Sequence, residues 1–291
     1  MLGLSLQKSL RNLLLLVGLC SQLLLAGCEY AYTGSGFNVL QENPNEEPWF
    51  SGYRPADMAE AIEARGELLP VIVWANGGCF RSDFPWQPLF KNWAAAGYVV
   101  LALSEAPANQ GGALGQTNVA DHGALIDWDI QKSPYNDMLD HDRIVAAGNS
   151  CGGITALGLT AQDPRVSAVF VLSGSSAIGS SSRSVMEAID VPVGYVIGGS
   201  TDIAGGPART DYERMSQDIP AMVVNRTIGG HVTVSTTASI LEEVAQIGLN
   251  WMELVLYGSP EAYDEPTADT VCAECTPGDW NLMARLLDTL L

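Results

Sequence analysis

Basic residues are scarce in this sequence. The 291 residues include 14 Lys and Arg against 33 Asp and Glu, which gives a formal net charge of −19 at pH 7. So acidic a surface argues against nucleic acid and anionic lipid as partners. It favours solubility, and neutral or cationic ligands over anionic ones.

The sequence also lacks an uninterrupted apolar run long enough to span a membrane. In residues 1–27, Lys8 and Arg11 precede the apolar segment Leu13–Leu19, and Ser21 interrupts the run soon afterwards. This stretch is short for a transmembrane helix and has the order of a secretory signal. We therefore expect residues 1–27 to be an export signal peptide.

The signal ends in Leu25-Ala26-Gly27-Cys28, which resembles the bacterial lipobox. That resemblance implies that the Cys28 thiol is lipidated and anchors the mature chain to a membrane. Residue 29 is Glu rather than the Asp that marks inner-membrane retention, so the expected location is the outer membrane of the bacterial cell envelope. The alternatives are an ordinary cleaved signal peptide or an uncleaved anchor.

Internal repeats and any sign of a second domain are missing too. Removal of residues 1–27 leaves 264 residues, with 12 basic and 33 acidic side chains and a formal net charge of −21. This length suits one large domain. Residues 28–50 mix Gly and Pro with Asn and Glu and are expected to form a tether. The folded domain is expected over residues 51–291.

Short apolar runs alternate with stretches of helical spacing along this domain. This alternation predicts an α/β fold with a doubly wound, mainly parallel sheet and helices on both faces. Only residues 173–190 separate two of the runs, which leaves no room for a large cap domain. The predicted strands are Leu69–Trp74, Tyr98–Leu103, Ile144–Ala147, Val166–Leu172, Val191–Ile197 and Met222–Ile228, and the longest predicted helix is 239–257.

The strand Ile144–Ala147 runs directly into Gly148-Asn149-Ser150-Cys151-Gly152, and a helical pattern follows. Strand, tight turn and helix around Gly-x-Ser-x-Gly form the arrangement that holds a nucleophilic serine in a strained, exposed position. The pentapeptide alone is weak evidence, because a Gly/Ser loop would read the same. Its context makes Ser150 the candidate nucleophile.

Histidine is rare as well, with three in the chain. A serine nucleophile needs a histidine base. In proteins with this type of turn, the catalytic residues occur along the chain in the order Ser, acid, His. His122 and His141 precede Ser150 and are expected to be surface or capping residues. His231, in Ile228-Gly229-Gly230-His231, follows Ser150 and is the candidate base.

The acid must lie between Ser150 and His231 and follow a strand. Asp202 ends a glycine-rich loop directly after the strand Val191–Ile197, where its carboxylate would fix the tautomer of the imidazole. Its rivals lie before strands or in helical stretches. These are Asp163, Asp190, Asp211 and Asp218, with Asp190 the strongest.

Serine attack on an ester creates an oxyanion, which needs two N–H donors. One is the amide after the nucleophile, that of Cys151. The other is expected in Asn76-Gly77-Gly78, which follows an earlier strand, and Gly78 is our choice. The alternative is a plain Gly-Gly turn.

Cysteines are few, six in the chain, and Cys20 leaves with the signal while Cys28 takes lipid. An exported protein lives where disulfides persist, and an even remainder of four fits two bridges. The four are Cys79, Cys151, Cys272 and Cys275.

If Gly78 and Cys151 direct amides at one oxyanion, their backbones lie close enough for a Cys79–Cys151 bridge. Cys272 and Cys275 would then pair locally. The alternatives are free thiols for the first pair, and a metal half-site or redox motif for the second.

The segments GNSCGG, GGSTDIA and IGGHV, in that order, resemble the α/β-hydrolase superfamily. Within it, the chain over residues 50–291 is similar to the dienelactone-hydrolase-like, cutinase-like and polyester-hydrolase-like serine esterases. The resemblance implies Ser150 as nucleophile, His231 as base and Asp202 as orienting acid, with no metal and no cofactor.

One departure bears on the substrate. Polyester hydrolases place a Trp after the strand that follows the nucleophile, where this chain has Ser173-Gly174-Ser175-Ser176. Aromatic polyesters are therefore not the expected substrate. Phe80, Phe84 and Trp86 either line an acyl pocket or pack in the core.

The sequence thus predicts a lipid-anchored serine carboxylesterase that cleaves small or lipid-like esters through an acyl-enzyme. An amidase or peptidase with the same triad is one alternative. A catalytically silent envelope binding protein on a hydrolase scaffold is another.

Overall fold

The computed structural model of the chain describes residues 29–30, 36–44, 46–104, 116–176, 183–259 and 278–290. The expected signal peptide, the lipidation site Cys28 and the expected Cys272–Cys275 bridge lie outside the described residues. No described helix has both the length and the apolar character needed to cross a membrane.

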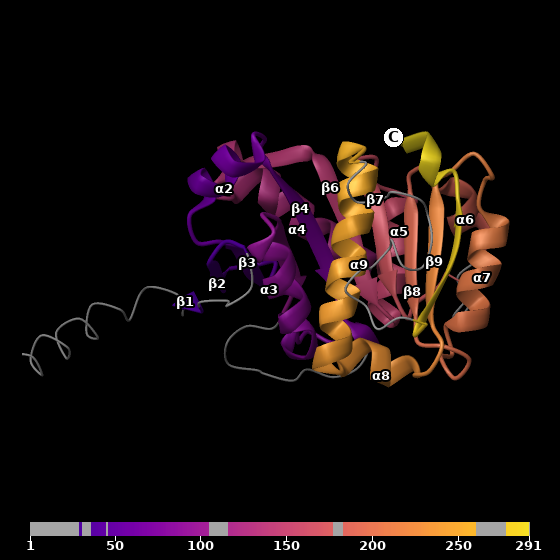
Figure 1. Cartoon of the computed structure of the whole chain (residues 1–291). Helices are drawn as coiled ribbons and strands as arrows, with labels where there is room; N and C mark the ends of the chain where they lie inside the picture. Colours follow the sequence, from indigo (N-terminus) through magenta and orange to yellow (C-terminus); the bar gives the residue numbers. More distant parts are fainter. Residues whose placement is uncertain are drawn as a thin grey trace, which may run out of the picture.

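The described strands form one sheet, and six neighbouring strands at its centre are parallel (Figure 1). Antiparallel pairs complete both edges. The order is β1-β2-β3-β5-β4-β6-β7-β8-β9-β10. The strands are β1 Glu29–Tyr30, β2 Val39–Glu42, β3 Phe50–Pro55, β4 Leu69–Ala75, β5 Val99–Leu103, β6 Leu139–Asn149, β7 Val166–Leu172, β8 Val193–Ile197, β9 Ala221–Arg226 and β10 Trp280–Arg285.

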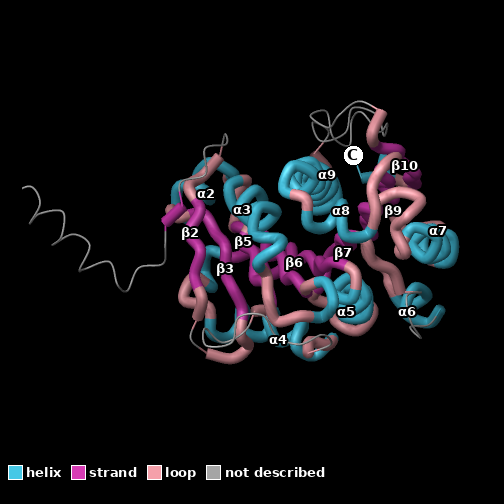
Figure 2. The backbone as a smooth tube through the Cα atoms, turned by 90° about the horizontal axis from the view of Figure 1, so that it is seen from below, coloured by secondary structure: helices cyan, strands magenta, loops and turns pink. Residues whose placement is uncertain are grey.

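Helices cover both faces of the sheet (Figure 2). In that view α3, α8 and α9 lie on one side of the strands, and α4, α5, α6 and α7 lie on the other. The helices are α2 Met58–Arg65, α3 Gln87–Ala95, α4 Val119–Lys132, α5 Cys151–Thr160, α6 Arg183–Ala188, α7 Gly205–Arg214, α8 His231–Thr236 and α9 Ala238–Tyr257. The predicted α/β class, with a mainly parallel sheet and flanking helices, is confirmed.

The continuous apolar runs reflect strands that are buried on both faces. In β4 every residue is buried, and successive side chains alternate between two cores. Ile72 and Trp74 pack with α3 and α9, whereas Val71 and Val73 pack with α4 and α5. Packing in these two cores holds the strands in position, and the residues of the candidate site follow the strand ends.

Part of the expected tether, residues 28–50, belongs to the folded domain. Val39–Glu42 forms the strand β2, which pairs with β3, and Val39 is buried in one of the cores. Ahead of it, the amide of Phe37 donates a hydrogen bond to the carbonyl of Ala95 in α3. The nearby Gly and Pro residues indicated a linker. They obscured the short strand β2, in which one residue, Val39, is buried.

Between β7 and β8 the described residues contain the six-residue helix α6 and short connections. No cap domain is present in this described part, as the spacing predicted. The carboxyl ends of β6, β8 and β9 are therefore left open for the residues that follow them.

Candidate active site

The turn from β6 into α5 holds Ser150 with φ 50° and ψ −114°, a conformation that is strained for a residue with a Cβ. Two glycines permit this turn. A Cβ added to Gly152 would lie 1.9 Å from the carbonyl oxygen of Ala75, and one added to Gly148 would lie 2.4 Å from that of Gly152. The backbone of α5 therefore contacts the ends of β4 and β6 with no side chain between them. This close approach leaves Ser150 on the outside of the turn.

The structure brings the three predicted catalytic residues together. His231, the first residue of α8 after β9, has Nε2 2.8 Å from Ser150 Oγ and Nδ1 2.8 Å from Asp202 Oδ1. Asp202 follows β8 and Ser150 follows β6. A continuous hydrogen-bonded chain therefore joins the ends of three parallel strands.

The Asp202 carboxylate is buried and fully hydrogen-bonded. Oδ1 accepts from His231 and from the amide of Ala204, and Oδ2 accepts from Ser173 Oγ and the amide of Gly198. Burial by itself would raise the pKa of Asp202, but these hydrogen bonds, with that of His231 the strongest, outweigh it and lower the pKa below its ordinary value. The acid stays ionised, as required for holding a protonated imidazole.

The rival acids either bind other side chains or are exposed to solvent. Asp211 is buried and accepts hydrogen bonds from Ser175 and Ser176. Asp163 forms an ion pair with Arg165. The other two rivals, Asp190 and Asp218, are exposed.

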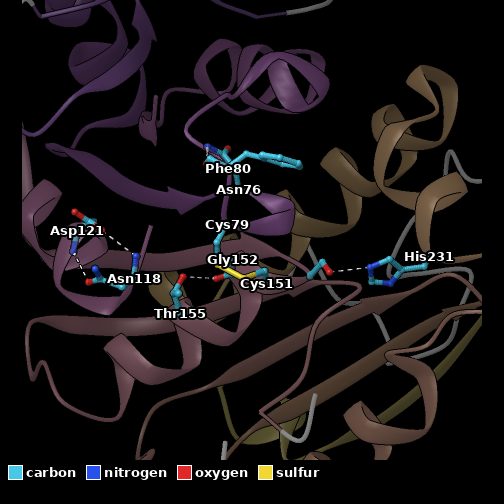
Figure 3. The surroundings of a disulfide bond; sticks show 10 residues. Asn76, Cys79, Phe80, Asn118, Asp121, Cys151, Gly152, Thr155 and His231 are labelled. Atoms are coloured by element: carbon cyan, nitrogen blue, oxygen red, sulfur yellow. Dashed lines mark hydrogen bonds between the residues drawn. A yellow bond between two sulfur atoms is a disulfide. The ribbon is translucent and has the colours of Figure 1, made fainter. Parts of the chain in front are cut away.

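The segment after β4 forms a short 3-10 turn, Gly77–Cys79, against the start of α5. A disulfide joins Cys79 to Cys151 with the Cα atoms 5.2 Å apart. Figure 3 shows this bond, with His231 on the far side of Cys151. The two predicted oxyanion residues, Gly78 and Cys151, are thus held beside each other, and Gly78 takes φ 64°, which suits glycine.

Asn76, which was not among the predicted site residues, is fully buried. Its Oδ1 accepts from Trp74 Nε1 at 3.1 Å, and its Nδ2 donates to the carbonyls of Phe80 and Leu103. Asn76 therefore ties the turn to the ends of β4 and β5. An Asn directly after a buried strand is a signal that could have revealed this role.

Beside Ser150 and His231 lies a cleft of about 440 Å³. Among its described lining residues none carries a formal charge apart from His231 when protonated. Phe80 and Trp86 form part of the wall, and Trp86 also packs against Trp74 in the core. Trp86 therefore both lines the cleft and packs in the core, whereas Phe84 is 75% exposed and does neither.

The surface prediction for His122 is wrong. Its side chain is fully buried, and Nε2 lies 2.8 Å from the carbonyl oxygen of Val73. Burial lowers the pKa of His122 to about 4, so the ring is neutral at physiological pH. The helical spacing from His122 to Leu125 and Ile126 already marked the buried face of α4. His141 is part-exposed, with Nε2 3.3 Å from Asp129 Oδ2.

The described residues contain no group of three or more His, Cys, Asp or Glu that could hold a metal ion. The chain matches no protein-family profile and no curated protein.

Proposed function

We propose that this protein is a serine carboxylesterase of the α/β-hydrolase type that acts on neutral esters. The hydrogen-bonded chain from Ser150 Oγ through His231 to Asp202, at 2.8 Å for each contact of the imidazole, is the observation that supports it. A strained serine in contact with a histidine that a buried carboxylate orients is an activated nucleophile.

In the proposed reaction Ser150 Oγ attacks the ester carbonyl carbon, and its proton passes to His231 Nε2. The carbonyl oxygen becomes an oxyanion beside the amides of Gly78 and Cys151. Collapse breaks the carbon–oxygen bond to the alcohol, which leaves with the proton from His231. Water then attacks the acyl carbon and gives a proton to His231 Nε2. The bond between the acyl carbon and Ser150 Oγ breaks, Oγ takes that proton back, and the carboxylic acid is released.

The lining of the cleft supports neutral substrates. Phe80, Pro85, Trp86 and Val232 give it apolar surface. The chain as a whole is strongly negative, with a formal net charge of −19. A carboxylate-bearing ester would meet repulsion from the net charge and no Lys or Arg among the described lining residues of this cleft.

Two reagents test the proposal. A fluorophosphonate probe reacts with an activated serine, and peptide mapping should place the label on Ser150. A panel of p-nitrophenyl esters of rising acyl length should be hydrolysed, whereas the matching p-nitroanilides separate an esterase from an amidase. Absence of both labelling and turnover in folded, oxidised protein would leave a silent binding protein.

We also propose that Cys28 anchors the domain to the bacterial outer membrane. The charged start, the apolar segment and the lipobox-like end of residues 1–28 support this. Cys28→Ser should release or mislocalise the protein, because lipid attaches to the thiol. A Cys28→Ser protein that still fractionates wholly with membranes would contradict the anchor.

A further inference from the structure

A short serine-rich segment, Ser173–Ser176, follows β7 and lies behind the candidate acid. Ser173 Oγ donates a hydrogen bond of 2.6 Å to Asp202 Oδ2, and its own amide donates to the carbonyl of Val196. Ser173 has no exposed surface. Its hydroxyl is therefore bonded to Oδ2, the carboxylate oxygen that does not contact His231.

Ser173 adopts φ 46°, in the left-handed region that favours glycine. The next residue is Gly174, yet the residue with a side chain occupies the strained position. Strain of this kind persists where surrounding contacts enforce it, and it is a sign of a functional constraint. The hydroxyl is the part of Ser173 that glycine could not supply.

A second buried carboxylate fixes the other end of the segment. Asp211 Oδ2 accepts from Ser175 Oγ at 2.6 Å and from the amide of Ser176 at 2.7 Å, while Oδ1 accepts from Ser176 Oγ at 2.6 Å. Asp211 lies in α7, which begins at Gly205 shortly after Asp202. The same stretch of chain that carries the acid thus also anchors the segment that contacts it.

We propose that Ser173 is a positioning residue for the candidate catalytic acid, held in place by the anchoring of Ser175 and Ser176 to Asp211. This inference rests on the proposed hydrolase function. With Ser173 present, Asp202 Oδ2 has two donors and the carboxylate plane is fixed, so Oδ1 faces His231 Nδ1. Without the hydroxyl, Oδ2 keeps the amide of Gly198 and the carboxylate is freer to rotate.

The test compares Ser173→Ala and Ser173→Gly with the wild-type protein on one neutral p-nitrophenyl ester. Loss of a hydrogen bond to a charged group should lower kcat about 10- to 100-fold. KM should change by less than about twofold, because Ser173 does not line the cleft. The Gly variant should have a higher Tm than the Ala variant, since glycine relieves the strain at φ 46°.

The titration of the Asp202 carboxyl group separates positioning from a general structural role. The Ser173 hydroxyl is one of the groups that lower the pKa of Asp202, so its loss should raise that pKa. Carboxyl-carbon NMR of protein labelled at Asp should therefore show Asp202 taking up its proton at a higher pH in both variants. Ser167→Ala is the control, because this serine lies in β7, the strand that Ser173 follows, and its hydroxyl contacts the carbonyl of Ile144 instead.

Wild-type kcat in both variants would overturn the inference, and so would a loss of kcat that follows Tm with an unmoved titration of Asp202. Ser173→Gly keeps the test valid if Ser173→Ala does not fold. Failure of the wild-type protein to label with fluorophosphonate or to turn over ester refutes the proposed function itself. An active wild-type protein with unaffected Ser173 variants refutes the positioning role alone.

Discussion

At the scale of single residues, the candidate site depends on a few backbone positions whose conformation or close packing excludes most other residue types. Ser150 and Ser173 both take positive φ values, and both hydroxyls contact the hydrogen-bonded chain that ends in Asp202. Gly152 has no space for a Cβ beside Ala75. The chemistry is therefore set by where the backbone places two hydroxyl groups and one carboxylate.

Ser150→Ala should abolish measurable ester hydrolysis and fluorophosphonate labelling, because no other group supplies the nucleophile. Its Tm should stay within a few degrees of wild type, since Oγ lines the cleft rather than the core. His231→Ala should lose nearly as much activity, and the double variant should be little worse than either single one. Steady-state kinetics and thermal melts would check this, and full turnover by Ser150→Ala would refute the proposed nucleophile.

A buried carboxylate away from the cleft offers a test of stability. Burial raises the pKa of Asp129 to about 7, and neither carboxylate oxygen accepts a hydrogen bond from any described residue. His141 Nε2 lies 3.3 Å away and offsets part of the cost when it is protonated. The unfolded chain ionises this group near pH 4, at about the pKa of a free Asp. Between about pH 4 and 7 the folded state binds more protons than the unfolded state, so this group makes stability fall as pH rises.

Asp129→Asn removes that titration and should stabilise the protein, by at most about 4 kcal/mol at pH 8, from a pKa difference of about 3 units. The gain should be smaller at pH 5, where the folded wild-type protein keeps the proton. Urea unfolding at both pH values measures the difference. An equal or larger gain at pH 5 would contradict the assigned protonation.

At the scale of elements, the parallel strands were predictable and the antiparallel ones were not. Five predicted central strands agree with β4, β5, β7, β8 and β9 to within two residues at each end, because burial on both faces gives continuous apolar runs. β6 begins five residues before the predicted Ile144, in a polar stretch. β1, β2, β3 and β10 were missed. β2 and β10 each have one buried residue, and in β3 Ser51, Gly52 and Arg54 interrupt the apolar pattern.

The candidate site was predictable for a related reason. Motif order along the chain specified Ser150, Asp202 and His231, and the structure places them in contact. Ser173 and Asn76 were not predicted. Asn76 has two partners close in sequence, Trp74 and Phe80, and its place after a buried strand was a usable signal. Ser173 meets Asp202 across the sheet, and a hydroxyl without a motif carries no signal of which distant carboxylate it meets.

The Cys79–Cys151 disulfide connects the turn after β4 to the start of α5, and its removal should act on both. Cys79→Ser should lower stability by about 4 kcal/mol on the chain-entropy estimate for a loop of this size, with sequence separation 72. It should also lower kcat with little change in KM, because Gly78 loses its restraint beside the oxyanion.

Kinetics and unfolding on oxidised and Cys79→Ser protein would measure the two effects. Cys151→Ser is the matched variant, because it breaks the same bond and keeps the amide at position 151. Loss of stability with unchanged kcat in both variants would mean that the disulfide holds the fold but not the oxyanion donors.

At the scale of the whole molecule, the amino-terminal edge marks where the domain begins. A chain starting at residue 36 keeps β2 and should melt at the same temperature as one starting at residue 29. A chain starting at residue 45 loses Val39 from the core and Glu42 from its ion pair with Arg54. It also exposes the edge of β3, so it should have a lower Tm and aggregate more readily. Equal Tm values for the two shorter chains would show that β2 does not contribute.

The position of the disulfide along the chain has a consequence for the timing of assembly. Both cysteines lie in the first 151 of 291 residues, and they follow the neighbouring strands β4 and β6. Chains emerge from synthesis amino end first, and both sulfur atoms of this bond are present before β8 and β9 are made. Asp202 and His231 arrive with β8 and β9. The candidate nucleophile can therefore be covalently secured before its candidate base exists, and under the proposed function the protein gains its reactivity last.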